Sequence, residues 1–243
     1  LSAAFLWLHT YSNDYNREQG DLNNYIHDSA ILYDLSKKDK YAFFNIMIGN
    51  AEDKTEKKTM VYSKAWFSNT DAFNKTIGID SSSNPPRAQR FITRLNVLFR
   101  FLSFNHFQVH FIFFASISFL GIILWVKALA ILGINPLISL IALGITPSIL
   151  FWSGGISKEA IMVFSIGLSL FSILKTGKKT HYLLLAVFGI WLMYTLKPYI
   201  LICFSIPLIL LMFIKKTNFE KKLIYCLFPI ILIITFIANS HYG

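Results

Sequence analysis

Apolar residues form long, almost uninterrupted runs in the second half of the chain, and short polar connections separate these runs. An apolar helix needs about 20 residues to cross the roughly 30 Å hydrocarbon core of a bilayer. Flanking lysines can extend a shorter run to the interface. Leu1–Leu8 is also apolar and predicts the end of a further, truncated span. The complete spans that the pattern predicts are Gln108–Val126, Ala128–Trp152, Ser157–Leu174, His181–Leu196, Pro198–Ile214 and Leu223–Ala238.

Residues 9–107 are polar but contain many aromatic side chains, which a disordered segment lacks. Apolar residues recur at helical spacing after Gly20, so a helix is expected to begin at Asp21. We therefore expect residues 9–107 to be folded. The chain as a whole is expected to have three parts: the end of a truncated span at 1–8, a large outer loop at 9–107, and the transmembrane helix bundle at 108–243. The fold class is all-α, a polytopic transmembrane helix bundle.

The turn-forming stretch Asp80–Pro86 precedes a second predicted helix, over 87–107. An amphipathic helix with arginines on its polar face typically lies in the membrane interface. Such arginines either anchor the helix to anionic lipid or bind the phosphates of a lipid-linked substrate, to which their bidentate geometry is suited. The polar face carries Arg87, Arg90 and Arg94, and the adjoining apolar face carries Phe91, Leu95, Leu98 and Leu102.

Composition supports the membrane interpretation, since 54% of the residues are hydrophobic and only 15% are charged. Residues 108–243 contain only two acidic residues, Glu159 and Glu220. Lysines cluster in alternate connections, around Lys127, in 175–179 and in 215–222, so those connections are expected to be cytoplasmic. The long loop then lies on the outer face. The net charge of +10 is explained by the membrane, and no nucleic-acid partner is expected.

Two aspartates near the start of the outer loop, Asp21 and Asp28, are candidate catalytic residues. A carboxylate close to the bilayer surface can act as a general base toward an acceptor hydroxyl, or can bind a divalent cation. Helix capping and solvation are the alternative explanation for either residue. The sequence contains no tight cluster of oxygen ligands, so a divalent cation is left open and no metal site is predicted.

Two lysines at predicted span ends on the outer face are the second group of candidates. In the turn Pro147–Glu159, Ser157 is suited to cap the next helix and Glu159 to lie in its first turn. Lys158 opposes the helix dipole, which favours an external anion or Glu159 as its partner. Lys197 precedes Pro198 and either snorkels to the interface or binds a ligand. Lys158, Glu159, Lys197 and the three arginines are the predicted donor-phosphate-binding residues.

This layout resembles the GT-C superfamily of integral-membrane glycosyltransferases. The motifs PSILFWSGGISKE, at 147–159, and KPYI, at 197–200, are similar to motifs in multispanning membrane proteins of Bacteroidetes-type bacteria. The resemblance implies a sugar donor linked to a polyprenyl phosphate and a catalytic aspartate in the first outer loop. By position, Asp21 or Asp28 matches that aspartate. The adjacent acidic pair that some of these enzymes carry is absent, so the choice between the two stays open.

The expected function is therefore transfer of a sugar from a polyprenyl-linked donor to a surface glycan or lipid acceptor, at the outer face of a bacterial inner membrane. Membrane lipid, the donor and the acceptor are the expected partners. A transporter or flippase is the alternative, although its inverted repeats and ionisable midplane residues are not seen in the sequence. A non-catalytic subunit of a polysaccharide assembly system is the third interpretation.

Overall fold

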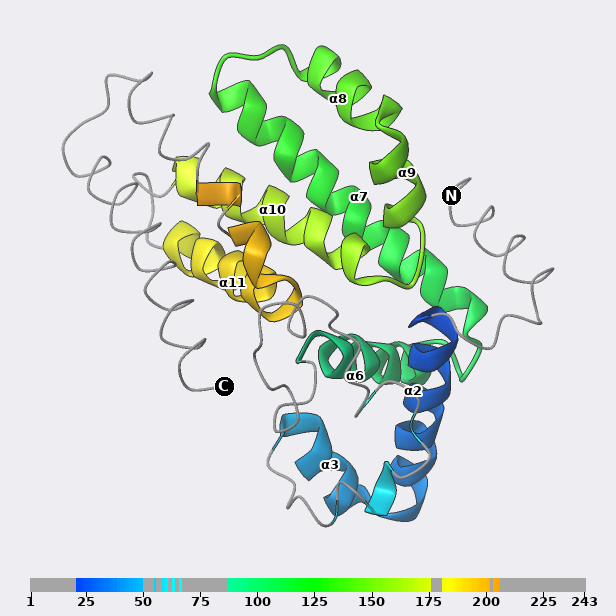
Figure 1. The fold of residues 1–243 in the computed structure, drawn as a ribbon. Helices are drawn as coiled ribbons and strands as arrows, with labels where there is room; N and C mark the ends of the chain where they lie inside the picture. The colour runs from blue at the N-terminus through cyan, green and yellow to red at the C-terminus, as the bar shows by residue number, and fades with distance from the viewer. Residues whose placement is uncertain are drawn as a thin grey trace, which may run out of the picture. The chain divides into compact units, whose positions relative to one another are not determined.

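The computed structural model describes residues 21–49, 55, 58–60, 63, 66, 87–175, 181–201 and 203–205. All regular secondary structure among these residues is helical, which confirms the all-α class. Two compact units divide the chain, one built from 1–72, 84–118 and 146–161, the other from 73–83, 119–145 and 162–243. The helices are α2 (Asp21–Lys38), α3 (Lys40–Ile48), α6 (Arg87–Leu102), α7 (Gln108–Ile131), α8 (Pro136–Ile145), α9 (Pro147–Ser153), α10 (Lys158–Lys175) and α11 (His181–Leu196) (Figure 1).

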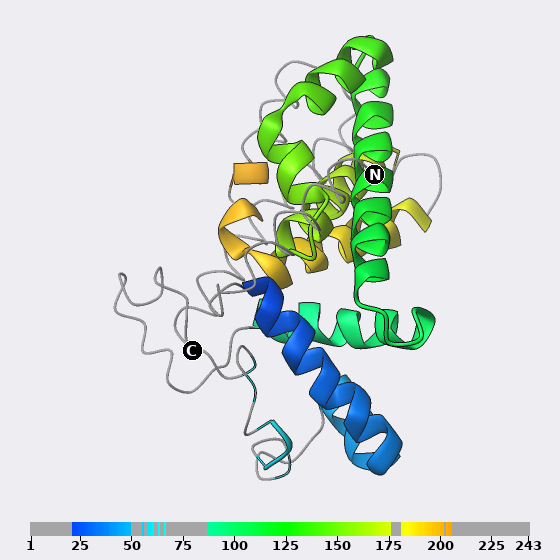
Figure 2. The same ribbon diagram turned by 90° about the vertical axis from the view of Figure 1, so that its right-hand side faces the viewer.

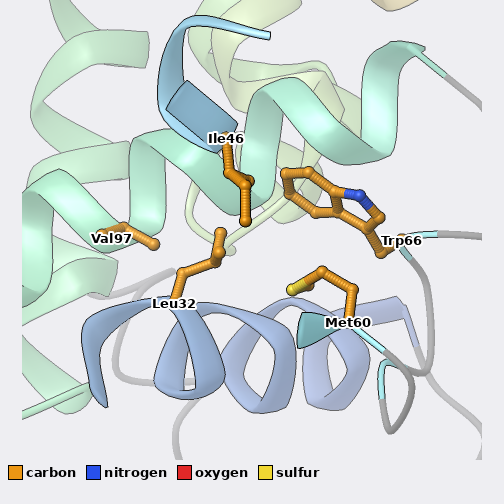
Figure 3. Packing of buried hydrophobic residues seen from close by; sticks show 5 residues of the cluster. All are labelled: Leu32, Ile46, Met60, Trp66 and Val97. Atoms are coloured by element: carbon orange, nitrogen blue, oxygen red, sulfur yellow. The ribbon is translucent and has the colours of Figure 1, made fainter. Parts of the chain in front are cut away.

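In the first unit, α2 packs against both α3 and α6. Its core is a cluster of five fully buried apolar side chains drawn from α2, α3, α6 and the segment between α3 and α6 (Figure 3). The prediction of a helix beginning at Asp21 is confirmed, and Leu22, Tyr25 and Leu32 are buried at the expected spacing. The cluster consists of Leu32, Ile46, Met60, Trp66 and Val97.

Local caps define both ends of α3. The side chain of Asp39 accepts a hydrogen bond from the backbone N–H of Ala42, at 3.0 Å, and so satisfies one of the unpaired donors of the first turn. At the other end Gly49 has a φ of 86°, a left-handed conformation that glycine adopts without steric cost. Gly49 N–H bonds back to the carbonyl oxygens of Asn45 and Ile46.

Helix α6 begins at Arg87 as predicted but ends at Leu102, so the expected extension to Phe107 is wrong. The reason is a tight turn in which Phe104 and Asn105 have φ values of 50° and 71°, which no α-helix allows. The buried side of α6 is unusually polar. Its polar residues are Gln89, Thr93, Asn96 and Arg100, whereas Leu98 and Leu102 on the predicted apolar face are exposed.

Glycines bring the helices of the second unit into close contact. A Cβ atom added at Gly167 on α10 would lie 2.1 Å from the backbone oxygen of Gly121 on α7. A Cβ atom at Gly189 on α11 would lie 2.4 Å from Ser169 Oγ and 3.1 Å from the backbone oxygen of Ser165. Helices α7 and α10, and α10 and α11, therefore cross backbone to backbone, which small residues at the contact permit.

Helix α7 is the long, upright green helix of Figure 2. It begins at Gln108 as predicted but ends at Ile131, five residues beyond the predicted end of the first span at Val126. Among the described residues it alone is both long and apolar enough to cross a membrane. The next prediction, a single span over Ala128–Trp152, is wrong. A turn at Gly133, with a φ of 92°, separates α7 from α8, and Thr146 with Pro147 separates α8 from α9. Proline cannot donate the backbone hydrogen bond that a continuous helix requires.

Two other predicted spans coincide with helices to within one residue at each end. Helix α10 covers Lys158–Lys175, where Ser157–Leu174 was predicted, and α11 covers His181–Leu196. The predicted span Pro198–Ile214 is helical at 198–201 and 203–205, and its remainder lies outside the described residues. Leu1–Leu8 and Leu223–Ala238 lie outside them entirely.

Candidate functional site

Asp28 lies fully buried in α2, and its carboxylate joins α2 to the segment before α6. One oxygen accepts a hydrogen bond from the backbone N–H of Trp66 at 2.9 Å. The other oxygen lies 3.2 Å from Nδ1 of the half-exposed His27. A buried carboxylate is stable only when such donors replace its water. In this arrangement Asp28 holds Trp66 in place.

Trp66 is itself fully buried, and two arginines of α6 lie against its indole. The Cζ atoms of Arg90 and Arg94 are 5.3 and 5.4 Å from the ring centroid, within the range of a cation–π interaction. The Arg94 guanidinium also lies beside Gly49 at the end of α3, where a Cβ atom would be in ordinary van der Waals contact with Nη2, at 3.5 Å. Two of the three predicted arginines thus converge on one aromatic ring.

The side chains of Asp21 and Arg87 lie outside the described part of the structure, although both residues are helical. Asp21 is the first residue of α2, seven positions before Asp28. Of the predicted site residues, the structure therefore groups Asp28, Arg90 and Arg94 around Trp66. Trp66 is one of the many aromatic residues of 9–107, and nothing in its sequence context distinguishes it from the others.

Arg100 is a buried residue that the sequence analysis missed. Its Nε donates to Ser29 Oγ at 3.0 Å and its Nη2 to the backbone oxygen of Ile26 at 2.7 Å, so it ties α6 to α2. Its Nη1 donates to Oδ1 of Asn105 in the following turn. Burial lowers the pKa of Arg100 below its usual range, and Asp34 and Tyr33 oppose that shift. The guanidinium keeps its proton in proteins.

A second buried polar chain joins α6 to the first turn of α7. Nδ1 of His110 lies 2.9 Å from Asn96 Oδ1, and its Nε2 lies 3.2 Å from Ser103 Oγ. The ring of Phe99 meets the same imidazole edge-on, with 6.1 Å between centroids. These contacts fix where α7 begins relative to α6. The available signal was an ionisable residue within an apolar run, which marks a site that needs polar partners.

The charged turn before α10 follows the predicted capping pattern. The hydroxyl of Ser157 accepts a hydrogen bond from the backbone N–H of Ala160, at 3.4 Å, and Glu159 lies in the first turn of α10. Lys158 and Glu159 are both half-buried. Lys197, also half-buried, follows α11 and belongs to the second unit, so a joint site of the two lysines stays a prediction.

No group of three or more histidine, cysteine, aspartate or glutamate side chains that could hold a metal ion occurs among the residues the structure describes. No protein family model, curated protein or solved structure matches this chain.

Proposed function

We propose that this chain is a membrane-embedded glycosyltransferase that takes a sugar from a polyprenyl-linked phosphate donor at the outer membrane face. The observation that carries the proposal is the convergence of Arg90 and Arg94 on the indole of Trp66. Contact with the ring restricts the positions of both guanidinium groups, whose N–H donors lie in one plane. Planar, bidentate donation of this kind is how arginine recognises phosphate.

Features of the helices support a membrane location. Helix α7 has 24 residues, which at 1.5 Å per residue give about 36 Å, enough to cross a hydrocarbon core of about 30 Å. Large apolar side chains of α8 and α11 are exposed, as expected for surfaces that face lipid. They include Leu137, Ile138, Ile141 and Ile145 of α8 and Leu184, Val187 and Trp191 of α11.

We propose the following roles on the basis of the resemblance and of the burial of Asp28. Asp28 is fully buried and holds Trp66, so we place the general base at Asp21. Lys158, with Glu159 beside it, and Lys197 supply charge to the departing phosphate, where stabilisation of developing negative charge lowers the barrier. A surface glycan or lipid hydroxyl is the acceptor. The runner-up, a transporter or flippase, has no specific observation in its favour.

The decisive experiment is sugar transfer by the purified chain reconstituted in vesicles with a radiolabelled polyprenyl-phosphate sugar. The Asp21→Asn variant should lose roughly a hundredfold to ten-thousandfold in turnover while donor binding stays nearly intact. Asp28→Asn, compared at equal amounts of folded protein, serves as the matched control and should remain active. Donor movement across the bilayer without sugar transfer would overturn the proposal and indicate a flippase.

Orientation is tested separately by cysteine labelling of intact cells at Thr70 and Lys178, both outside the described residues, after replacement of Cys203 and Cys226. The alternating lysine connections place Thr70 outside and Lys178 inside. An impermeant reagent that modified position 178 and spared position 70 would show the inverse topology, and the outer-face mechanism would be lost.

A further inference from the structure

The turn between α6 and α7 exposes a phenylalanine in a strained backbone conformation. The backbone N–H of Asn105 bonds to the carbonyl oxygen of Arg100 at 2.9 Å, the closure typical of a Schellman motif at a helix end. In this motif the residue before Asn105 takes the left-handed conformation and is usually glycine. Here it is Phe104, with a φ of 50°. A bulky side chain at positive φ is uncommon and is disfavoured by contact with its own backbone.

Phe104 is also 85% exposed, so the part of the chain that the structure describes leaves its ring largely uncovered. Leu98 and Leu102 on the preceding turns are 50% and 65% exposed, and Phe101 is 46% exposed although its ring packs against Tyr33 and Phe43. Strained residues persist where the surrounding structure fixes them, and they cluster at functional positions. Both the strain and the exposure are accounted for if an apolar environment outside the protein receives this corner.

A hydrogen-bonded clamp keeps the corner in this conformation. Arg100 donates to the side chain of Asn105 as well as accepting from its backbone, so the two residues close the turn twice. Because Arg100 is also bonded to Ser29 and Ile26, the turn is fixed to α2. Phe104 is therefore held in a set direction by a buried network. Arg100 is a positioning residue for it.

The residues around Phe104 indicate that the apolar environment of this corner is lipid. Phe104 stands four residues before Gln108, where the membrane-length helix α7 begins, so it is at the level where that helix leaves the hydrocarbon. Residues 87–107, on the same side of α7 as the corner, carry Arg87, Arg90 and Arg94 besides the buried Arg100 and contain no acidic residue, which complements anionic headgroups. Aromatic rings are enriched at this depth.

We infer that the α6–α7 corner inserts into the boundary between headgroups and acyl chains, with Phe104 as the inserted side chain and the Arg100–Asn105 contact as its support. This inference rests on the proposed membrane location of α7 but not on sugar transfer. Insertion at this point fixes the depth of α6 and so the height of the Trp66–Arg90–Arg94 group relative to the lipid phosphates.

The test measures depth in the full chain, with Cys203 and Cys226 replaced by alanine. A cysteine at position 102 or 104 is labelled with an environment-sensitive fluorophore, and the chain is reconstituted in phosphatidylcholine–phosphatidylglycerol vesicles. Quenching by a lipid with a nitroxide near its headgroup should be strong at both positions. Lys38→Cys, an exposed position at the end of α2, is the control and should be quenched by aqueous iodide instead.

A second variant isolates the ring. Phe104→Gly keeps the left-handed turn and relieves its strain, so in the Leu102→Cys background it should lower lipid quenching severalfold without unfolding the corner. Unchanged quenching would overturn the role of Phe104. Insertion would be overturned by iodide quenching at position 104 or by equal lipid quenching at positions 38 and 104. It would also be overturned by blue-shifted emission at 104 without lipid quenching, which would show that protein covers the corner. Flotation of the unlabelled chain with vesicles reports the membrane location independently.

Discussion

Asp28 and Trp66 are 38 positions apart in the sequence, yet the carboxylate of the first accepts the backbone N–H of the second at 2.9 Å inside the first unit. This bond fixes the ring against which Arg90 and Arg94 lie. Sequence position alone made Asp28 a catalytic candidate, whereas this hydrogen bond indicates a structural role for it. Its contribution should be measurable as stability.

Replacement of Asp28 by alanine should lower the free energy of unfolding by about 1–3 kcal/mol, because the buried N–H of Trp66 loses its acceptor. Asparagine retains one acceptor oxygen, so Asp28→Asn should cost less. Chemical unfolding of the purified variants, followed by tryptophan fluorescence, checks the order. Normal stability combined with abolished sugar transfer would contradict the structural role and return Asp28 to the catalytic candidates.

Trp66→Leu should weaken binding of a phosphate-bearing donor, because both arginines lose the ring that orients them. At about 0.5–1 kcal/mol for each cation–π contact, the loss corresponds to roughly a fivefold to thirtyfold higher Kd. Trp66→Phe keeps an aromatic face and is the matched control. The measurement is donor binding by the reconstituted chain.

A double-mutant cycle with Trp66→Leu and Arg94→Gln tests whether the two side chains act together. Residues that share one contact should give an interaction energy of about 0.5 kcal/mol or more. Strict additivity would mean that Trp66 only supports the core and that Arg94 binds donor, if at all, without it.

The sequence predicted those parts of the fold that local pattern determines. Apolar runs identified α10 and α11 to within one residue and also the start of α7, which ends five residues later than predicted, because a long apolar helix is specified by its own composition. The break between α8 and α9 was missed although Pro147 stood at the boundary. There the apolar run continues without interruption, but the missing N–H of proline ends one helix and begins the next.

The candidate site was harder to predict from the sequence, because its contacts join segments that are distant along the chain. Helical spacing grouped Arg90 with Arg94, but nothing local connects them to Trp66. Arg100 was overlooked since it lies six positions beyond Arg94, on another side of α6, and its acceptors are on α2. Tertiary packing alone selects such partners.

Because α7 and α10 are in close contact in the second unit, one added methyl group at Gly167 should lower stability markedly. Gly167→Ala would place Cβ 2.1 Å from the backbone oxygen of Gly121, so α7 and α10 must separate. Overpacking of this kind costs about 1–3 kcal/mol or more. Thermal unfolding in detergent measures the loss.

Gly144→Ala in α8 is the matched control, because a Cβ there meets nothing within 4 Å. Alanine favours a helix over glycine by about 1 kcal/mol, so this variant should be as stable as the parent or more so. If Gly167→Ala were equally harmless, the backbone contact between α7 and α10 would be absent from the folded protein.

The buried guanidinium of Arg100 joins α6 to α2, so its replacement should affect both helices. Arg100→Met fills a similar space but leaves Ser29, Asn105 and the carbonyl of Ile26 without their donor. Asn105 is exposed to water and the Ile26 carbonyl still accepts a hydrogen bond from Ser29 Oγ, so the main loss is at the buried Ser29, and it should destabilise the first unit by about 1–3 kcal/mol. Arg100→Lys keeps the charge, but a single ammonium cannot reproduce the planar fork that reaches three acceptors, and it should rescue only part of the loss. Hydrogen exchange of the backbone amides in α2 and in the 103–106 turn measures both effects. Faster exchange in α2 and in the turn together is expected, since one side chain joins them, whereas faster exchange in the turn alone would show that α2 does not depend on this contact.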